Sequence, residues 1–249
     1  MFDDSRVAGN NLHGKTIADL FLLLILISGI GFAFYFLKTE DGISNHIKYG
    51  LKTGIVALSL IAWFKSQSMI AGREMKSGLI GDGIHDLTEK INSYFAANDK
   101  AANRLLVVTS MLIDFFGLFL IGAAIFGPSM QPFIALLILF AMRQGCQAFC
   151  ALPAPPRMIW RDPGFPSLLV TYGVSNDFFF SGHTAVAVLG SIVVFNLCPL
   201  WIGVVAGVVA ILEMAAVLVL RAHYTMDVFS AVVAAFCSYG LASWICAFV

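Results

Sequence analysis

The chain has 249 residues, of which 59% are hydrophobic and only 12% are charged, and its formal net charge is zero. A soluble domain of this length carries roughly 25% charged residues, because its surface must be hydrated. The composition therefore excludes an ordinary soluble protein, and the balanced charge gives no reason to expect nucleic acid as a partner. We predict an all-α, polytopic membrane helix bundle.

Apolar stretches that are long enough to cross a bilayer recur along the chain. A helix needs about 20 mostly apolar residues to cross ~30 Å of hydrocarbon. The stretches that meet or approach this length are 17–37, 48–65, 104–126, 131–150, 181–198, 200–220 and 223–247. The second stretch is short and carries Lys52, so the sequence predicts six to seven transmembrane helices. The short links at Gly127-Pro128 and Cys198-Pro199 predict antiparallel neighbours.

Two longer polar segments separate these stretches, 66–102 and 151–176. Within the first, the spacing predicts an amphipathic helix, which lies in the membrane interface or, alternatively, is a solvated helix packed against protein. Its apolar face would carry Ile84, Leu87, Ile91, Tyr94 and Phe95, and its polar face His85, Asp86, Glu89 and Lys90. The second segment is rich in proline and predicts an ordered loop near the membrane surface.

Two short motifs stand at the starts of apolar stretches. One is Asp177-Phe-Phe-Phe-Ser-Gly-His183-Thr184, and the other is Arg221-Ala-His223-Tyr-Thr-Met-Asp227. An antiparallel return between them brings His183 and His223 to the same membrane face. His223 and Asp227 are four residues apart, so on a helix they would be adjacent. A carboxylate beside an imidazole fixes its tautomer and makes the other ring nitrogen a better nucleophile.

These residues predict phosphoryl transfer in two steps. His223 would attack phosphorus and form a phosphohistidine, with Asp227 orienting the ring. His183 would protonate the leaving oxygen and then act as base on the acceptor, while Arg221 would neutralise the phosphate oxygens. Either histidine alone has an alternative role as a structural, hydrogen-bonded residue at the interface. Two histidines and a spaced aspartate that converge on one face fit that alternative less well.

Further polar residues lie within the apolar stretches. Asp114, Arg143 and Glu213 are placed roughly 9–15 Å below the predicted catalytic face, a depth at which an unpaired charge is costly. Asp114 and Arg143 form an ion pair in one interpretation. In the other, a polar cavity admits a lipid headgroup, and Asp177 and Glu213 face its positive charge. The predicted substrate-binding residues are Arg143, Asp177, Ser181, Glu213, Arg221 and Tyr224.

Aromatic residues near the two motifs have two possible roles. Trp160, Tyr172 and the Phe178–Phe180 run offer faces for a quaternary ammonium group. Aromatic side chains are also common anchors at a membrane interface, so the pattern alone does not separate the two roles.

The motifs carry a resemblance to a known group of enzymes. Ser181-Gly-His183 with His223-x-x-x-Asp227 resembles the phosphatidic acid phosphatase superfamily. Phe180-Ser-Gly-His-Thr184 with His223-Tyr-Thr-Met-Asp227 is similar to its sphingomyelin synthase branch, which includes plant phosphatidylcholine:diacylglycerol cholinephosphotransferases. Arg143-Gln-x-Cys146 followed by Leu152-Pro-x-Pro155 resembles a third motif of that branch. The resemblance covers about 104–247.

The resemblance implies His183, His223 and Asp227 as a catalytic triad, without a metal or cofactor, in a core of six transmembrane helices. We accordingly expect N-terminal membrane segments with the amphipathic helix over 1–103 and a catalytic membrane core over 104–249. Two departures favour the synthase branch over the phosphatases: Phe180 stands where these usually have proline, and Val217 stands where they have arginine.

The expected activity moves phosphocholine, or phosphoethanolamine, from a phospholipid to ceramide or diacylglycerol, with phosphatidylcholine as the favoured donor. A lipid phosphate phosphatase and a non-catalytic lipid-binding or scrambling protein are the alternatives. The distribution of Lys and Arg predicts a cytoplasmic active site, whereas the animal sphingomyelin synthases resembled here act on the opposite face. The side, the host membrane and the oligomeric state stay open.

Overall fold

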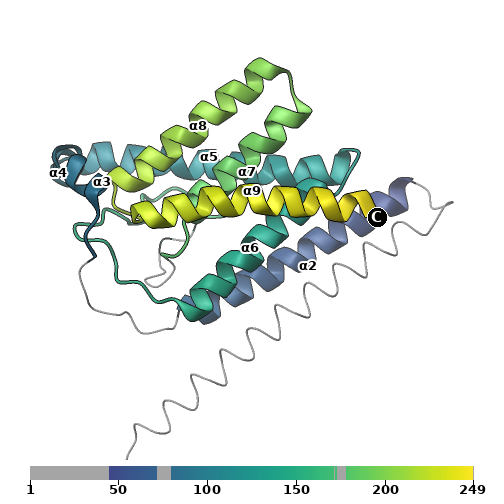
Figure 1. Cartoon of the computed structure of the whole chain (residues 1–249), viewed down its shortest axis with the longest axis horizontal. Helices are drawn as coiled ribbons and strands as arrows, with labels where there is room; N and C mark the ends of the chain where they lie inside the picture. Colours follow the sequence, from purple (N-terminus) through teal and green to yellow (C-terminus); the bar gives the residue numbers. More distant parts are fainter. Residues whose placement is uncertain (1–44, 72–79, 171, 173–177, 249) are drawn as a thin grey trace, which may run out of the picture. The chain divides into compact units, whose positions relative to one another are not determined.

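The computed structural model describes residues 45–71, 80–170, 172 and 178–248, which form helices, turns and loops without a strand (Figure 1). The chain divides into two units, Met1–Ile70 with Val249 and Ala71–Phe248. Helix α2 (Asn45–Ala71) accounts for nearly all the described part of the first unit. The predicted stretch 17–37 lies outside the described residues.

The second unit contains the remaining helices and both sequence motifs. Its helices are α3 (Gly83–Leu87), α4 (Glu89–Ala97), α5 (Asp99–Phe126), α6 (Gln131–Phe149), α7 (Gly182–Leu197), α8 (Leu200–Val219) and α9 (Thr225–Phe248). In the described part of the chain, five helices are long and apolar enough to cross a membrane: α2, α5, α6, α8 and α9. Helix α7 is apolar but has only 16 residues. The predicted all-α, polytopic membrane bundle is confirmed.

Local chemistry fixes several helix ends. Pro132 occupies the second position of α6, and Pro199 directly precedes α8; a proline costs no hydrogen bond in a first turn, where no intrahelical acceptor is available. The side chain of Ser181 accepts a hydrogen bond from the Thr184 amide and caps α7. Gly127 ends α5, and an added Cβ there would overlap the carbonyl oxygen of Ala123.

Helix α7 lies among α5, α6, α8 and α9 and is buried along most of its length. Gly190 lets α7 approach Phe116 of α5, because a Cβ at this glycine would stand 2.8 Å from the ring atom Cγ. Ser191 Oγ donates to the carbonyl of Ala206 on α8 at 2.7 Å. Helix α7 is therefore held among four longer helices.

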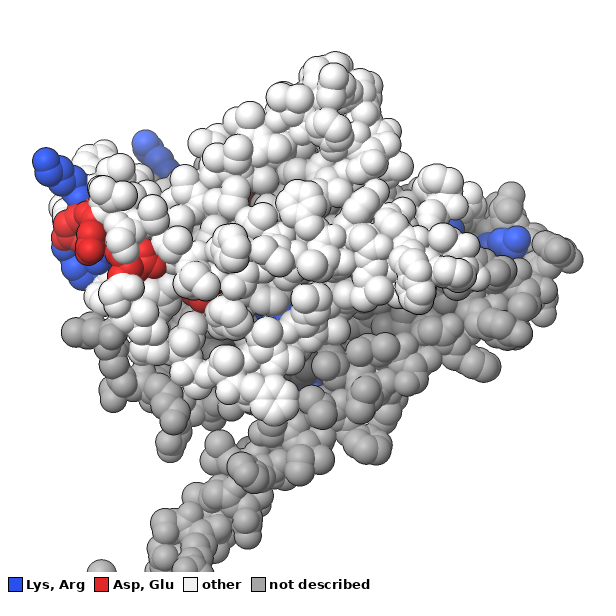
Figure 2. Space-filling model, viewed as in Figure 1, with Lys and Arg blue, Asp and Glu red and all other residues white. Residues whose placement is uncertain are grey.

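The outer faces of the long helices carry exposed apolar side chains, as a lipid-facing surface requires. Phe115 of α5, Leu212 of α8 and Phe229 of α9 are each about 60% exposed. Charged side chains gather instead at the end of the molecule where α3, α4 and the start of α5 lie (Figures 1 and 2). A charged end beside exposed apolar faces suits the boundary between hydrocarbon and water.

The segment after α6 is an ordered loop in its described part, as predicted. Asp114 of α5 holds it by accepting hydrogen bonds from Ser167 Oγ and from the amides of Leu168 and Leu169. Asp114 is thus bound to the loop, and within the described ranges it forms no ion pair with Arg143. That interpretation of the sequence is corrected: the carboxylate at this depth is satisfied by backbone amides and a hydroxyl.

Candidate active site

His223 lies in the turn between α8 and α9, two residues before α9 begins. It therefore does not share a helix with Asp227, although the spacing suggested this. The two side chains still meet, with 3.7 Å between His223 Nδ1 and Asp227 Oδ2. Asp227 Oδ2 also accepts the amide of Tyr224 at 2.8 Å, as a third-position acid does in a capping box. One carboxylate thus caps α9 and lies beside the imidazole.

The carbonyl oxygen of Phe178 decides the tautomer of His223. It lies 2.9 Å from His223 Nδ1, and a carbonyl can only accept, so Nδ1 carries the hydrogen. Asp227 Oδ2, at 3.7 Å, is beyond hydrogen-bond distance and acts through its charge. The lone pair of neutral His223 is consequently on Nε2. From the sequence, a carboxylate is expected to fix the tautomer of His223, whereas in the structure a backbone carbonyl does so.

The first motif meets the second through backbone as well as side chains. The amide of Ser181 donates to the carbonyl of Asp227 at 3.2 Å, and both residues are fully buried. His183 follows in the first turn of α7, where His223 and Arg143 both act electrostatically on its ring. His183 Nε2 is buried and, within the described part of the chain, makes no hydrogen bond.

Two predicted substrate-binding arginines have protein partners. Arg143 Nε donates to the carbonyl of Phe180 at 2.9 Å, and its guanidinium lies against Gly182, where a Cβ would stand 3.3 Å from Nε. Arg221 binds the carboxylate of Glu89 and donates to the carbonyl of His85 at 3.1 Å. Both guanidinium groups hold the segments that carry the histidines, and their contact with substrate stays a prediction.

The other predicted substrate-binding residues are placed differently. Asp177 lies outside the described residues. The hydroxyl of Tyr224 is buried, as are both carboxylate oxygens of Glu213, and none of these atoms has a partner among the described residues. Asp227 Oδ1 is likewise buried and has no hydrogen-bond partner among the described residues. Buried polar atoms in this state are costly, and they are expected where a ligand completes a site.

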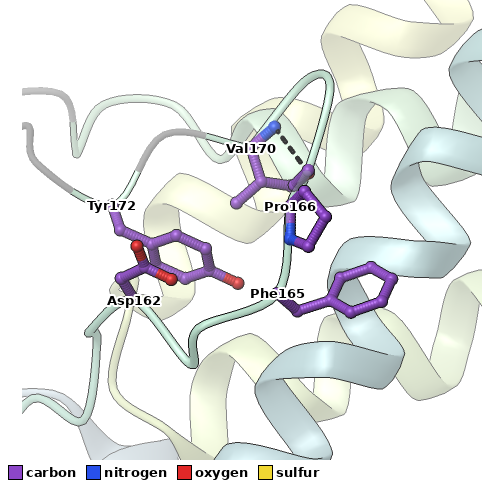
Figure 3. A pocket seen from close by; sticks show the side chains of 6 residues that line it. Asp162, Phe165, Pro166, Val170 and Tyr172 are labelled. Carbon is purple, nitrogen blue, oxygen red and sulfur yellow. Dashed lines mark hydrogen bonds between the residues drawn. The ribbon is translucent and has the colours of Figure 1, made fainter.

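An aromatic row connects His183 to a pocket in the loop. The Trp160 ring meets the edge of His183 at a centroid distance of 5.0 Å and the ring of Tyr172 at 5.0 Å. Tyr172 in turn lines a pocket of about 490 Å³, together with Asp162, Phe165, Pro166, Ser167 and Val170 (Figure 3).

Negative charge surrounds Tyr172. Figure 3 shows the carboxylate of Asp162 beside the Tyr172 ring. Burial, and then the charges of Asp162, Asp114 and Glu213, raise the pKa of Tyr172 despite its hydrogen bond with Ser110. The aromatic row is thus bordered by carboxylates, an arrangement suited to a positively charged group.

Sequence reasoning missed the residues that hold the His223 turn from outside. Asp82, His85 and Asn92 bind the segment 219–225 through hydrogen bonds. The predicted amphipathic helix has His85 on its polar face and does not single out Asp82 or Asn92, and a polar face on such a helix is more simply assigned to water. No local signal distinguishes the two.

Comparison with known proteins identifies the family of the chain. Neither a curated protein nor a solved structure matches the chain. The family model AtPDCT1/2 matches residues 82–244, which is about two thirds of the chain and includes α3, α4 and both histidine motifs. The chain therefore belongs to the AtPDCT1/2 family, the phosphatidylcholine:diacylglycerol cholinephosphotransferases of the membrane.

Proposed function

We propose that this protein transfers phosphocholine from phosphatidylcholine to diacylglycerol through a phosphohistidine on His223. Family membership supports the donor and the acceptor. The observation that carries the mechanism is the hydrogen bond between His223 Nδ1 and the carbonyl of Phe178, because it leaves the Nε2 lone pair for attack. The motifs also support a place in the phosphatidic acid phosphatase superfamily, which remains part of this proposal.

The first half-reaction breaks the bond between phosphorus and the glycerol oxygen of the donor. His223 Nε2 attacks phosphorus, and a protonated His183 gives its proton to the leaving oxygen, which departs as diacylglycerol. Phosphocholine is then bonded to Nε2, and the ring carries a positive charge. Asp227, 3.7 Å from Nδ1, stabilises that charge.

The second half-reaction reverses these steps with another diacylglycerol. His183 takes the proton of the acceptor hydroxyl, the oxygen attacks phosphorus, and the bond to Nε2 breaks. His183 suits both roles because its Nε2 is buried without a hydrogen-bond partner in the described part of the chain. The products are a new phosphatidylcholine and the free enzyme, so neither water nor an external acid is consumed.

The choline group is proposed to bind along the aromatic row. Trp160 touches His183 on one side and Tyr172 on the other, so a headgroup whose phosphate meets the histidines can reach either ring. Glu213 is 1% exposed, and its carboxylate has no partner among the described residues. A quaternary ammonium offers no hydrogen bond, but its charge compensates a buried carboxylate and binds to aromatic faces.

The reaction is tested with the full chain in nanodiscs that contain choline-labelled phosphatidylcholine and a diacylglycerol with distinct acyl chains, beside His223→Ala. Label in the new phosphatidylcholine, lost in the variant, supports the proposal. Water-soluble label would indicate hydrolysis instead. Ceramide, offered in parallel nanodiscs, would yield labelled sphingomyelin if it is an acceptor.

The intermediate is tested separately with phosphorus-labelled phosphatidylcholine and a base quench. A phosphorus–nitrogen bond survives base and is cleaved by acid, so wild-type protein should carry acid-labile label and His223→Ala should carry none. Active enzyme that never acquires such label would contradict the phosphohistidine while leaving the transferase activity intact.

The choline site is tested by donor preference. Trp160→Ala and Glu213→Gln should each raise the KM for phosphatidylcholine more than the KM for phosphatidylethanolamine, since only the first donor has a quaternary ammonium. Trp201→Ala is the matched control, because Trp201 lies on the same helix as Glu213 and is 69% exposed. Equal effects on both donors would argue against this site.

A further inference from the structure

Helices α3 and α4 present two opposite stripes of side chains. Three residues add about 300° and four add about 400° of helical rotation, so residues at such spacings share a face. One such stripe contains Leu87, Ile91 and Tyr94, and the other contains His85, Glu89 and Asn92. The second stripe is offset from the first by two residues, or about 200°, which places it on the opposite side.

The polar stripe is the buried one and binds the turn that carries His223. His85 is 4% exposed, and its Nε2 lies 3.0 Å from the carbonyl oxygen of His223. Because that carbonyl accepts, His85 Nε2 is the donor. Asn92 is fully buried and donates to the carbonyl of Val219 at 2.9 Å. Glu89 binds the guanidinium of Arg221.

Asp82, which precedes α3, extends this contact to the start of α9. Its carboxylate caps α3 by accepting the amide of Ile84 at 3.0 Å. It also accepts the amide of Thr225 at 2.6 Å and the Thr225 hydroxyl at 2.7 Å. The segment 219–225, which contains His223, is therefore bound along its length by Asp82 and the polar stripe.

The apolar stripe faces away from the protein. Leu87 is 80% exposed, Ile91 50% and Tyr94 56%. Only Asn98 separates α4 from α5, whose lipid-facing side includes Val108. The stripe lies at the end where charged side chains gather (Figure 2). Apolar side chains beside such a cluster of charge suit the boundary between headgroups and acyl chains.

We infer that α3 and α4 form an interfacial clamp, which docks Leu87, Ile91 and Tyr94 into the bilayer surface and thereby holds the His223 turn through its polar stripe. The occupant of the apolar face is lipid. A short helix pair has few contacts of its own, so lipid on one side adds to the free energy that keeps the other side in place. His85 is a positioning residue in this scheme. Its effect on turnover rests on the proposed function, but its effect on the turn does not.

The docking is tested by hydrogen exchange over 219–225 in the full chain, in nanodiscs and in a lipid-free amphipathic polymer. Wild-type protein should exchange on the order of tenfold faster without lipid. The double variant Leu87→Ser with Ile91→Ser should exchange fast in both. Leu200→Ser with Trp201→Ser is the matched control, because both residues are exposed and lie at the opposite end of α8. It should behave as wild type.

Two results would overturn the inference. One is equal exchange of the wild-type segment with and without lipid. The other is a loss of dimer mass in the Leu87→Ser, Ile91→Ser variant, which would identify a second copy of the chain as the occupant. Neither result depends on catalysis, so a protein without transferase activity would contradict the proposed function and leave this test valid.

The polar stripe is tested by His85→Ala and His85→Gln, because the glutamine amide can donate to the His223 carbonyl as the imidazole does. His85→Ala should speed exchange over 219–225 and lower kcat with little change in KM, and His85→Gln should restore both. If His85 had a purely structural role, its substitution would lower thermal stability and His85→Gln would not restore kcat. Such a result would count against the clamp.

Discussion

The charge of Asp227 is the feature whose removal gives the sharpest test of the site. Asp227→Asn keeps an oxygen that can accept the Tyr224 amide, so the cap of α9 should survive. What the variant loses is a negative charge 3.7 Å from His223 Nδ1. At an effective dielectric constant of about 20, two unit charges at that distance attract by about 4 kcal/mol. The attraction applies only while the imidazole is positively charged, as it would be in the proposed phosphohistidine and in the transition states on either side of it.

A loss of about 4 kcal/mol corresponds to a fall in kcat on the order of 10³-fold, at about 1.4 kcal/mol per factor of ten. The assay is transfer of labelled choline to diacylglycerol in nanodiscs. Asp86→Asn is the matched control, since Asp86 is an exposed carboxylate and should keep wild-type turnover. Unchanged melting temperature in both variants would show that folding is intact.

An Asp227→Asn variant that retains more than about a tenth of wild-type kcat would refute the electrostatic role of Asp227, because less than about 1.4 kcal/mol would then come from the charge. A variant that does not fold would also contradict this role, since the capping role would then outweigh the electrostatic one. A large fall in kcat with an intact fold supports the ion pair.

Two further predictions concern stability. Burial alone would raise the pKa of Asp82, but hydrogen bonds from Thr225 lower it below its ordinary value of 3.8. The ionised Asp82 carboxylate therefore stabilises the folded protein above pH 3.8, and this stabilisation is lost as the pH falls through the lower pKa of the folded state. The difference in Tm between wild type and Asp82→Asn should therefore narrow in acid, and a constant difference would contradict this. Gly190→Ala should lower the free energy of unfolding by about 1–3 kcal/mol, because the added Cβ overlaps Phe116. Gly207→Ala, which meets nothing within 4 Å and lies inside α8, should not lower Tm.

The sequence predicts the helices well because, in a bilayer, the length and hydropathy of a stretch are nearly sufficient to identify a spanning helix. Each predicted stretch from 48 onwards corresponds to a helix, and the links at Gly127 and Cys198 fall between helices. Helix α7 is the exception in length. Its apolar residues are buried by neighbours, and this stretch need not match the full hydrocarbon thickness.

The candidate site is only partly predictable for a different reason. The types and spacing of His183, His223 and Asp227 predict phosphoryl transfer, since few structural roles need that pattern. The acceptor of the His223 Nδ1 hydrogen is the Phe178 carbonyl, and backbone groups leave no trace in side-chain identity. The partner of Asp114 was likewise a pair of amides and a hydroxyl, so a charge-pairing argument pointed to the wrong group.

The short length of α7 bears on whether a lipid alcohol or water accepts the phosphocholine group. Helix α7 has 16 residues and the antiparallel α8 has 20, and only Cys198 and Pro199 join them. By helical rise, the first residue of α7 therefore lies about 6 Å short of the level at which α8 ends. His183, in the first turn of α7, is therefore recessed towards the acyl chains. Diacylglycerol has no charged headgroup and brings its hydroxyl to such a depth, where water is scarce. The recess thus favours a lipid alcohol over water in competition for the phosphocholine group.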